Sequence, residues 1–434
     1  MTRIIAKHRG ERAGCHKKFT KALESGPVLA TLQSAVSASP AVLTSDMNLT
    51  NSSERFDLGV VGAGIVGLGT ALAGARRGLR VVVIDRDAQA NGASVRNFGF
   101  ITVTGQDHRS MWARARRTRE VWAEVAPRAG IPIIQEGLWM LARRPESLDV
   151  LKAFLETEMA VGCRLLTAAD ARRRCPALQA PDLLGVLEST TELRVESREA
   201  IPRLSAWLAE SHGVIFIRNT EVFGVDVPIL RTSRGELRAD RVVVCPGDDF
   251  NTLYPERFGS ERFGSHPLTR CKLQMLRLAS PGFTLPAALM SDLGLGRYAG
   301  YASLEAATPL KARLARDQPE HLKHGVHLIV VQSADGSLVV GDSHHYAATP
   351  DPFGSEAVDA LILEEFRAAL GIAPPPILER WIGTYASATD RQVLLDAPHP
   401  QVRIATVTSG AGASTGFAIG EEVMASLLDG GALT

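Results

Sequence analysis

The residue pattern with the clearest chemical meaning is GAGIVG, which occupies residues 62–67. It follows the apolar run 58–61 and precedes a segment of small residues. A second apolar run, 81–84, comes next and ends at Asp85. Strand, glycine turn, helix, strand and acid is the order of a dinucleotide-binding βαβ unit. The pattern therefore predicts that this part of the chain binds a dinucleotide cofactor.

Each residue type in this unit has a specific task in such binding. Gly62 permits a tight turn, Gly64 lets the backbone approach a pyrophosphate, and Gly67 lets the helix pack closely on the strand. The pyrophosphate would lie at the helix N-terminus, where free N–H groups and the helix dipole favour an anion. Asp85, 23 residues after Gly62, is placed to accept a hydrogen bond from a ribose hydroxyl.

A second glycine-rich turn, TSGAGASTGF at residues 408–417, lies about 340 residues further along the chain and opens a helix. FAD is long enough to need two such anchors. The second helix would direct its positive end at the flavin, where it stabilises negative charge on the reduced ring. Ser414 and Thr415 could donate to a flavin carbonyl or the ribityl chain. The alternative is a structural strand-to-helix turn with good capping.

The loop GASVRNFG, at residues 92–99, follows the first acid and is small enough to run along a cofactor. Ser94 can bond a phosphate, and Arg96 and Asn97 could reach the pyrophosphate or the flavin edge. Alternatively, this is a surface turn with a solvated arginine. The predicted FAD contacts are Gly62, Gly64, Ile65, Val66, Gly67, Asp85, Arg86, Ser94, Arg96, Asn97, Phe98, Val222, Gly247, Gly410, Gly412, Ala413, Ser414, Thr415 and Gly416.

The elements that would position these motifs interleave along the chain. Nucleotide-type elements lie at both ends and near 195–250, and less regular, strand-rich segments lie between them. This order predicts an α/β nucleotide-binding domain with a substrate domain inserted in pieces. The predicted FAD-binding domain comprises 55–105, 192–255 and 377–434. The predicted substrate domain comprises 106–191 and 256–376.

Composition excludes several classes of function. The chain has 434 residues and a net charge of +1, which offers no overall attraction to nucleic acid or anionic membrane. No apolar run approaches the roughly 20 residues of a membrane span. The five cysteines are scattered and the histidines form no HExxH pattern, so we expect reduced thiols, no metal site and a cytoplasmic protein.

The first residues differ from the rest. Residues 3–21 are rich in Arg and Lys, and 27–46 are small and weakly apolar, with polar interruptions that a signal peptide would not have. We expect 1–54 to be a disordered extension, or part of it to come from a start codon assigned too early, with Met47 as the alternative start. A targeting role is the other interpretation.

Together these motifs resemble the superfamily of D-amino-acid oxidase, glycine oxidase and sarcosine oxidase. Within it, the chain is most similar to the FAD-dependent oxidoreductases associated with aminophosphonate breakdown. The resemblance spans about 56–430 and is carried by the segments 92–99, 243–250, 253–255, 270–275, 341–346 and 409–416. It implies a Rossmann-like FAD-binding domain of the glutathione-reductase type and an α+β substrate domain built on an antiparallel sheet.

Two departures from the family pattern bear on the chemistry. Amino-acid-oxidising relatives carry Trp-x-Gly-x-Arg-Pro, whose arginine clamps the substrate carboxylate, whereas this chain has Tyr385 at the arginine position. That change puts an ordinary α-amino-acid substrate in doubt. Sarcosine-oxidase relatives link the flavin to a late cysteine. No cysteine follows Cys271, so we expect non-covalent FAD.

The resemblance implies 2-aminoethylphosphonate or its N-methyl form as substrate, and such an anion needs positive or polar partners. Each candidate has a structural alternative, because Lys and Arg side chains are usually solvated and a His pair after a strand usually belongs to a turn. The candidates are Lys272, His344 and Tyr385 as catalytic residues, and Arg297, Tyr298, Tyr301 and His345 as substrate-binding residues.

These observations predict an FAD-dependent amine oxidase or dehydrogenase. A hydride would pass from the carbon beside a neutral amine to flavin N5, and water would hydrolyse the resulting imine. We expect His344 to help accept the ammonium proton. The alternatives are a D-amino-acid or glycine-type oxidase, and a flavin- or NAD(P)-binding protein without amine chemistry. Whether oxygen or an electron carrier reoxidises the flavin, and the oligomeric state, stay open.

Overall fold

The computed structural model describes residues 54–259 and 267–431. The predicted N-terminal extension lies outside these residues apart from Glu54. Two β-sheets and the helices that cover them make up the described chain, which confirms the predicted mixed α/β class. None of the described helices is long and apolar enough to cross a membrane. The four described cysteines are free thiols.

The first sheet has a parallel centre in the order β18-β10-β1-β2-β7. β17 adds an antiparallel edge, and β8 and β9 form an antiparallel extension beside β10. The bounds of these strands are β1 (Arg55–Val61), β2 (Val81–Ile84), β7 (Ile215–Ile217), β8 (Val222–Asp226), β9 (Ile229–Thr232), β10 (Gly235–Val244), β17 (Val393–His399) and β18 (Val402–Val407).

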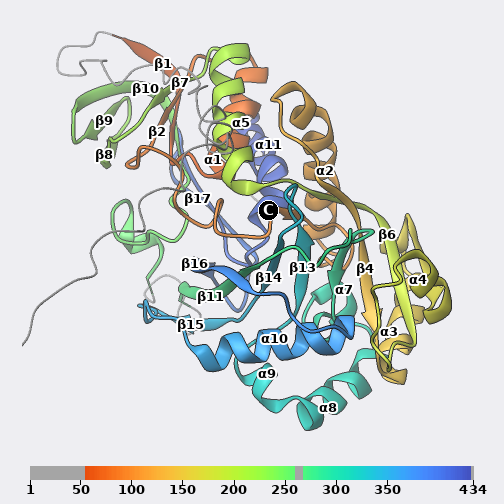
Figure 1. Cartoon of the computed structure of the whole chain (residues 1–434). Helices are drawn as coiled ribbons and strands as arrows, with labels where there is room; N and C mark the ends of the chain where they lie inside the picture. Colours follow the sequence, from red (N-terminus) through yellow and green to blue (C-terminus); the bar gives the residue numbers. More distant parts are fainter. Residues whose placement is uncertain (1–53, 260–266, 432–434) are drawn as a thin grey trace, which may run out of the picture. The chain divides into compact units, whose positions relative to one another are not determined.

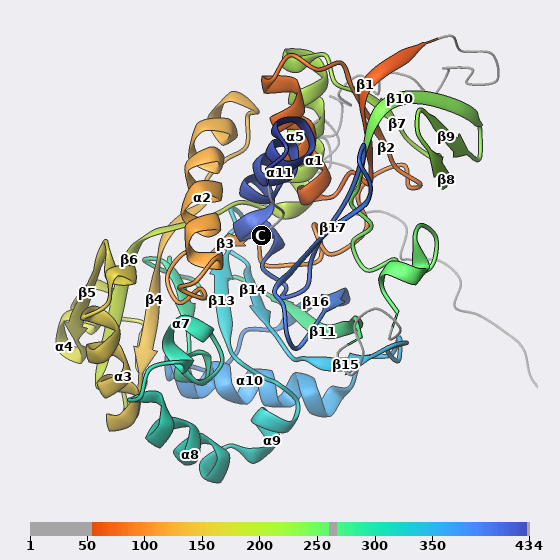
Figure 2. The same ribbon diagram turned by 180° about the vertical axis from the view of Figure 1, so that it is seen from behind.

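All four residues of β2 are buried, as expected for a central parallel strand covered on both faces. Figures 1 and 2 show three helices together against one face of this sheet, with α2 beside them. These helices are α1 (Ile65–Arg76), α5 (Ser197–His212), α11 (Gly412–Asp429) and α2 (Met111–Arg128). The predicted glycine turns therefore precede α1 and α11.

Register brings the predicted motifs to one edge of the sheet. Val61 pairs with both Ile84 and Val244, so the parallel strands end at the same level. The residues that follow, Gly62 and Asp85, thus lie beside each other. In open α/β sheets, ligands bind outside the carboxyl ends of the strands, so this edge is the expected binding position.

The second sheet follows the order β15-β11-β14-β13-β12-β4-β6-β3, with β16 on the other side of β11 and β5 beside β6. Its pairs are antiparallel except β12 with β4. The strands are β3 (Phe100–Ile101), β4 (Gln135–Ala142), β5 (Cys163–Thr167), β6 (Gly185–Arg194), β11 (Thr269–Leu278), β12 (Ala288–Met290), β13 (Ile329–Gln332), β14 (Leu338–Gly341), β15 (His345–Ala347) and β16 (Ile377–Ser387).

Apolar side chains of α10 pack on one face of the second sheet, and a cluster of shorter helices packs on the other. Figure 2 shows α10 running along the sheet, with α8 and α9 beyond it. The remaining described helices are α3 (Pro145–Leu155), η2 (Glu158–Ala160), α4 (Ala168–Arg174), η3 (Pro255–Arg257), η4 (Asp292–Gly296), α7 (Ala299–Ala302), α8 (Ala307–Asp317), α9 (Pro319–Lys323) and α10 (Glu356–Leu370).

Two strands belong to a different sheet from the one their sequence position predicted. β3 and β16 lie in segments assigned to the FAD-binding domain, yet both pair within the second sheet. β16 does so because it pairs along almost the whole length of β11. The domain boundaries themselves stay a prediction.

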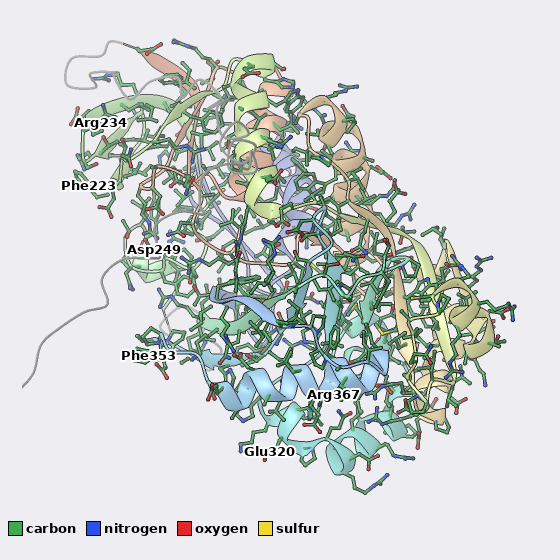
Figure 3. All side chains as sticks on the ribbon, in the orientation of Figure 1. Phe223, Arg234, Asp249, Glu320, Phe353 and Arg367 are labelled. Atoms are coloured by element: carbon green, nitrogen blue, oxygen red, sulfur yellow. The ribbon has the colours of Figure 1, made fainter. Side chains whose placement is uncertain are left out.

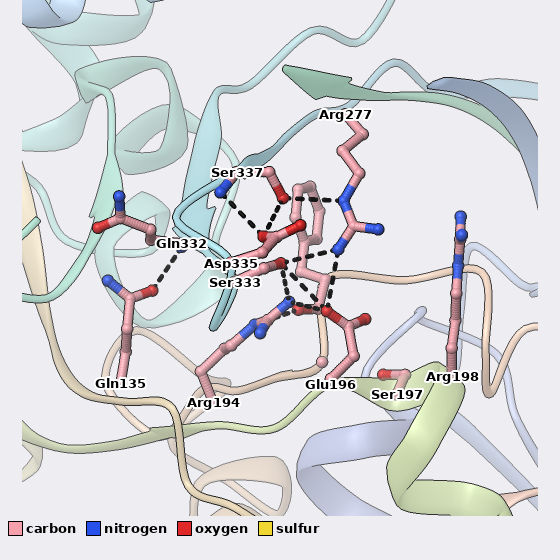
Figure 4. A network of polar contacts seen from close by, with 12 residues as sticks. Gln135, Arg194, Glu196, Ser197, Arg198, Arg277, Gln332, Ser333, Asp335 and Ser337 are labelled. Atoms are coloured by element: carbon pink, nitrogen blue, oxygen red, sulfur yellow. Dashed lines mark hydrogen bonds and ion pairs between the residues drawn. The ribbon is translucent and has the colours of Figure 1, made fainter. Parts of the chain in front are cut away.

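A polar network joins α5 to the second sheet (Figure 4). Glu196 precedes α5, and its Oε2 accepts hydrogen bonds from Arg194 Nη2 at 3.0 Å and from Ser333 Oγ at 3.1 Å. Arg277 Nη2 of β11 donates to the same oxygen at 3.4 Å. The Arg194 side chain is 1% exposed, so losing Glu196 would leave a buried guanidinium without its anion.

α1 and α11 approach each other through glycines. A Cβ on Gly69 would lie 2.6 Å from the carbonyl oxygen of Gly416, and a Cβ on Gly420 would overlap the backbone at Gly69. Real Cβ atoms do not come this close to backbone, so any larger residue forces the helices apart. The contact fixes the position of both helix N-termini.

We expect Gly420→Ala to destabilise the protein by about 1–3 kcal/mol, because the added methyl group overpacks the contact between α1 and α11. Thermal unfolding followed by circular dichroism measures the effect. Gly224→Ala on β8 is the matched control, since a Cβ there meets only ordinary contacts of 3.5 Å or more. Equal melting temperatures for the two variants would contradict the packing argument.

Candidate active site

A cavity of about 640 Å³ opens at the carboxyl ends of β1, β2, β10 and β18 and extends to the second sheet. This volume suits a small-molecule or cofactor site. Most predicted site residues line it, and they are Gly62, Gly64, Ile65, Val66, Gly67, Asp85, Arg86, Ser94, Arg96, Asn97, Phe98, Val222, Gly247, Arg297, Tyr298, His344, Tyr385, Gly410, Gly412, Ala413 and Ser414.

The first glycine turn has the geometry its sequence predicts. Gly62 has a φ of +101°, and a Cβ there would overlap the carbonyl oxygen of Cys245. A Cβ on Gly67 would overlap the carbonyl oxygen of Gly62. Only glycine fits these two positions, because the first needs a left-handed backbone and both are in contact with main chain.

The N-terminus of α1 faces the cavity without a capping side chain of its own. The Ser94 hydroxyl accepts a hydrogen bond from the Ile65 N–H at 2.9 Å, which ties the loop 92–99 to the helix. The first turn of a helix leaves N–H groups without intrahelical partners. Val66 and Gly67 lie in that turn and line the cavity, so the helix end suits a pyrophosphate.

Asp85 braces the glycine turn. Its Oδ2 accepts from the Ala63 N–H at 2.6 Å, and its Oδ1 accepts from the Asp87 N–H at 2.9 Å. Each carboxylate oxygen can accept a second hydrogen bond, so the predicted contact with a ribose hydroxyl is compatible with this bracing. Arg86 forms an ion pair at 2.6 Å with Asp249, which Figure 3 labels.

The second glycine turn lies against Tyr385. Gly410 has a φ of +74°, and a Cβ there would lie 3.0 Å from the Tyr385 ring. α11 begins at Gly412 without a side-chain cap. Gly412 and Ala413 line the cavity, so the helix N-terminus faces it. The Ser414 hydroxyl also lines the cavity, but it already bonds Thr102, accepting from its N–H at 2.9 Å.

Two predicted cofactor contacts in this turn have structural positions instead. The Thr415 hydroxyl donates to the carbonyl of Ala411 at 2.9 Å, within the helix. Gly416 packs against Ile65 and Gly69 of α1. Neither residue lines the cavity, because Thr415 is fully buried and Gly416 meets α1.

Side chains of the loop 92–99 mostly hold the loop itself. Asn97 Nδ2 donates to the carbonyl of Ala93 at 2.7 Å, and its Oδ1 accepts from the Gly99 N–H. Arg96 donates to Asn91 Oδ1 at 3.0 Å. The Trp381 indole donates to the carbonyl of Arg96 at 3.2 Å, which connects β16 to the loop.

The far part of the cavity gathers polar and aromatic side chains from the second sheet and its connections. Arg297, after η4, donates to the Tyr346 hydroxyl at 3.1 Å. Tyr298 and His327 are joined by a 3.3 Å hydrogen bond between the hydroxyl and Nε2. The ring centroids of His344 and Tyr385 lie 6.4 Å apart, so Tyr385 connects this cluster to the second glycine turn.

Burial controls the charges in this cluster. It raises the pKa of Asp342 to about 7, although Arg297 acts in the opposite direction. Burial, with a further contribution from Arg297, lowers the pKa of His327 and of His344 well below the usual histidine range. Both imidazoles are therefore neutral at physiological pH.

Three predicted substrate-site residues lie off the cavity. The Lys272 ammonium donates to the carbonyl oxygen of Phe353 at 2.9 Å. Figure 3 labels Phe353. His345 pairs with His324, with 2.9 Å between ring nitrogens. Tyr301 is fully buried against Phe154. The predicted roles of these three residues gain no support from their positions.

Sequence reasoning missed His327, Asp342 and Tyr346, which all line the cavity. Asp342 directly follows β14, and a carboxylate at the end of a strand is a signal that could have identified it. The sequence also predicted no metal site. Yet His327, Asp342 and His344 bring side-chain nitrogen and oxygen atoms within 4.8 Å of one another.

Comparison with known proteins agrees with this geometry. The family model described as "FAD dependent oxidoreductase" matches residues 57–426. A glycine oxidase of Geobacillus kaustophilus is 27% identical over 207 residues, which is 44% of this chain and 55% of the relative, so the match spans about half of that protein.

Solved structures share the fold. The glycine oxidase of Geobacillus kaustophilus superimposes with a TM-score of 0.67 at 20% identity, covering 88% of this chain and 96% of that one. The iminodiacetate oxidase of Chelativorans sp. BNC1 gives a TM-score of 0.66 at 19% identity, covering 86% and 96%. The L-proline dehydrogenase of P. horikoshii gives a TM-score of 0.69 at 20% identity, covering 87% of this chain and 95% of that one.

We expect Gly410→Ala to weaken FAD binding at least about 10-fold, because the new methyl group meets the Tyr385 ring and strains a left-handed backbone. Quenching of FAD fluorescence on titration into deflavinated protein measures the affinity. Gly78→Ala is the control: its φ is +78°, but a Cβ there has nothing within 4 Å. The argument fails if the two variants bind FAD equally well.

Proposed function

Because this chain belongs to the family of FAD-dependent oxidoreductases, we propose that it oxidises the C–N bond of a small amine that carries a distal anionic group. FAD is the cofactor of the family, and on binding it supplies the acceptor for a hydride from the carbon beside the nitrogen. The protein would contribute position, desolvation and charge. We propose 2-aminoethylphosphonate or its N-methyl form as the substrate.

The two glycine turns support the placement of FAD. The N–H groups at the start of α1 would hold the pyrophosphate, and Asp85 would accept from the ribose. The N-terminus of α11 would lie at the flavin, with Gly410 and Tyr385 beside it. Arg96, held by the loop 92–99, would lie between these anchors. Both helix ends lack a capping side chain of their own, and an anionic ligand would satisfy them.

One observation carries the substrate proposal: Arg297 lines the far part of the cavity and forms no ion pair with a carboxylate among the described residues. Its hydrogen-bond partner is the Tyr346 hydroxyl, so the guanidinium retains donors for an anion. The family's usual arginine position holds Tyr385, which lies on β16 against Gly410. The anion-binding charge thus comes from a different element.

A glycine- or D-amino-acid-type oxidase is the second candidate. The glycine oxidase relatives favour it, and Arg297 could also clamp a carboxylate. The two candidates differ in the length and charge of the anionic arm. A flavoprotein without amine chemistry is the third possibility, and it predicts that no amine reduces the flavin.

We expect 2-aminoethylphosphonate or its N-methyl form to bleach the oxidised flavin under anaerobic conditions, and glycine and D-alanine to do so much more slowly. Stopped-flow absorbance over this panel gives the rates. Faster bleaching by glycine or D-alanine would instead support the amino-acid oxidase. Bleaching by none of these compounds would refute amine oxidation of this class.

Arg297→Met should weaken binding of the anionic substrate about 10- to 100-fold, since a charge-assisted hydrogen bond contributes about 1.5–3 kcal/mol. The saturation constant for anaerobic flavin reduction measures this. Arg316→Met is the control, because Arg316 is exposed on α8 and does not line the cavity. An unchanged constant in Arg297→Met would remove Arg297 from the anion site.

A further inference from the structure

We propose that His327, Asp342 and His344 form the site that recognises the substrate's amine, and that the Asp342 carboxylate takes the proton that the ammonium loses before oxidation. This inference rests on the proposed amine oxidation. It adds a second, oppositely charged pole to a cavity whose other pole is Arg297. We refer to the three residues as the amine pole.

The hydrogen bonds of His344 determine what it offers to the cavity. Its Nδ1 lies 2.9 Å from the carbonyl oxygen of Gly325, which can only accept, so Nδ1 carries the proton. In the neutral ring, Nε2 is then an acceptor. It lies 3.8 Å from Asp342 Oδ2, which is also an acceptor when ionised. Two acceptors therefore face each other with no donor between them.

The other oxygen of Asp342, Oδ1, has no hydrogen-bond partner among the described residues. It lies 3.3 Å from His327 Nδ1, which likewise has no hydrogen-bond partner in the described part of the chain. The Asp342 and His327 side chains are 7% and 4% exposed. A buried polar atom left unpaired loses the hydrogen bonds it made to water, so this cluster is expected to bind a guest with donors.

A primary or N-methyl ammonium group matches these requirements. It carries a positive charge and two or three N–H donors, which suits one carboxylate and one neutral imidazole acceptor. The other titratable groups that interact with Asp342 are Arg297, Tyr298 and Cys271, and none of them supplies an anion, because burial raises the pKa of the tyrosine and of the thiol. Arg297 would hold the anionic end of the same molecule, so the cavity is matched to a zwitterion in both charges.

Proton transfer then follows from the same contact. The N–H bond of the ammonium breaks, an O–H bond forms on Asp342, and the lone pair returns to nitrogen, leaving R–NH₂ and a neutral carboxylic acid. Only the neutral amine has the lone pair that assists departure of hydride from the adjacent carbon. A pKa of about 7 for Asp342 is close to the value that suits a proton acceptor at physiological pH.

Flavin reduction by the amine should depend on pH through the protonation of Asp342. Below pH 7 the free enzyme holds Asp342 protonated, so it lacks the anion and cannot accept a proton. The ratio of the limiting rate of flavin reduction to the substrate saturation constant should therefore rise with pH through about 7. Asp342→Asn removes the titrating group, so this limb of the profile should disappear.

The binding test uses flavin-loaded protein and two ligands that share the anionic end. One is the amine that reduces the wild-type flavin, and the other is its counterpart without nitrogen, such as ethylphosphonate. Asp342→Asn should weaken binding of the amine at least about 10-fold, as expected for a lost charge-assisted hydrogen bond, and it should slow flavin reduction. The dissociation constant of the nitrogen-free ligand, measured from its perturbation of the flavin spectrum, should stay within about 2-fold of the wild-type value.

His344→Gln is a second variant, in case Asp342→Asn does not fold, and it should show the same selective loss for the amine. His345→Gln is the matched control. His345 is the next residue along the chain, yet it lies off the cavity beside His324. Its amine affinity and pH profile should match those of the wild type.

Three outcomes would overturn the inference. Equal weakening of both ligands would show a general disturbance of the cavity. An unchanged amine affinity in Asp342→Asn would place the amine elsewhere. Amine binding that chelator abolishes and Zn²⁺ restores would assign the three residues to a metal ion. If no amine reduces the wild-type flavin, the proposed function itself is wrong, which is a distinct result.

Discussion

The close approach of α1 to α11 is the constraint on which the rest of the site depends. Gly69, Gly416 and Gly420 let two helix backbones touch where any side chain would separate them. The helices come from opposite ends of the described chain, and this contact, together with the parallel pairing of β1, β10 and β18, brings their N-termini to one cavity. A ligand with a pyrophosphate and a remote ring can then be held at both ends. The same constraint explains why Gly416 packs against a helix and does not line the cavity.

A second requirement is that the two sheets keep a fixed relation across the cavity. Glu196 precedes a helix of the first sheet and receives hydrogen bonds from Arg194 and Arg277, which both belong to the second (Figure 4). The Trp381 indole adds a contact between β16 and the loop 92–99. Groups that would hold the cofactor and groups that would hold the substrate are thereby placed against each other, as hydride transfer demands.

Local patterns predicted well what depends on local geometry. Gly62, Gly67 and Asp85 were identifiable because turn, helix and acid lie within about one βαβ unit. Substrate residues were harder, because their placement depends on pairing between distant strands. His344 and His345 are adjacent, yet only His344 lines the cavity, since successive residues near a strand point to opposite sides. The predicted roles of Lys272 and Tyr301 gained no support from their positions for a similar reason, and Asp342 was missed because His327 meets it only in the fold.

The exchange of a clamping arginine for Tyr385 has a physical consequence beyond the loss of one charge. A guanidinium on β16 would lie beside Gly410, at the turn that opens α11. The cation that lines the cavity here, Arg297, instead follows η4 and donates to the Tyr346 hydroxyl. This difference in the origin of the cation is the reason why we propose a substrate whose anion and reacting carbon are separated by an additional methylene, and not an α-amino acid, in which the two are directly bonded.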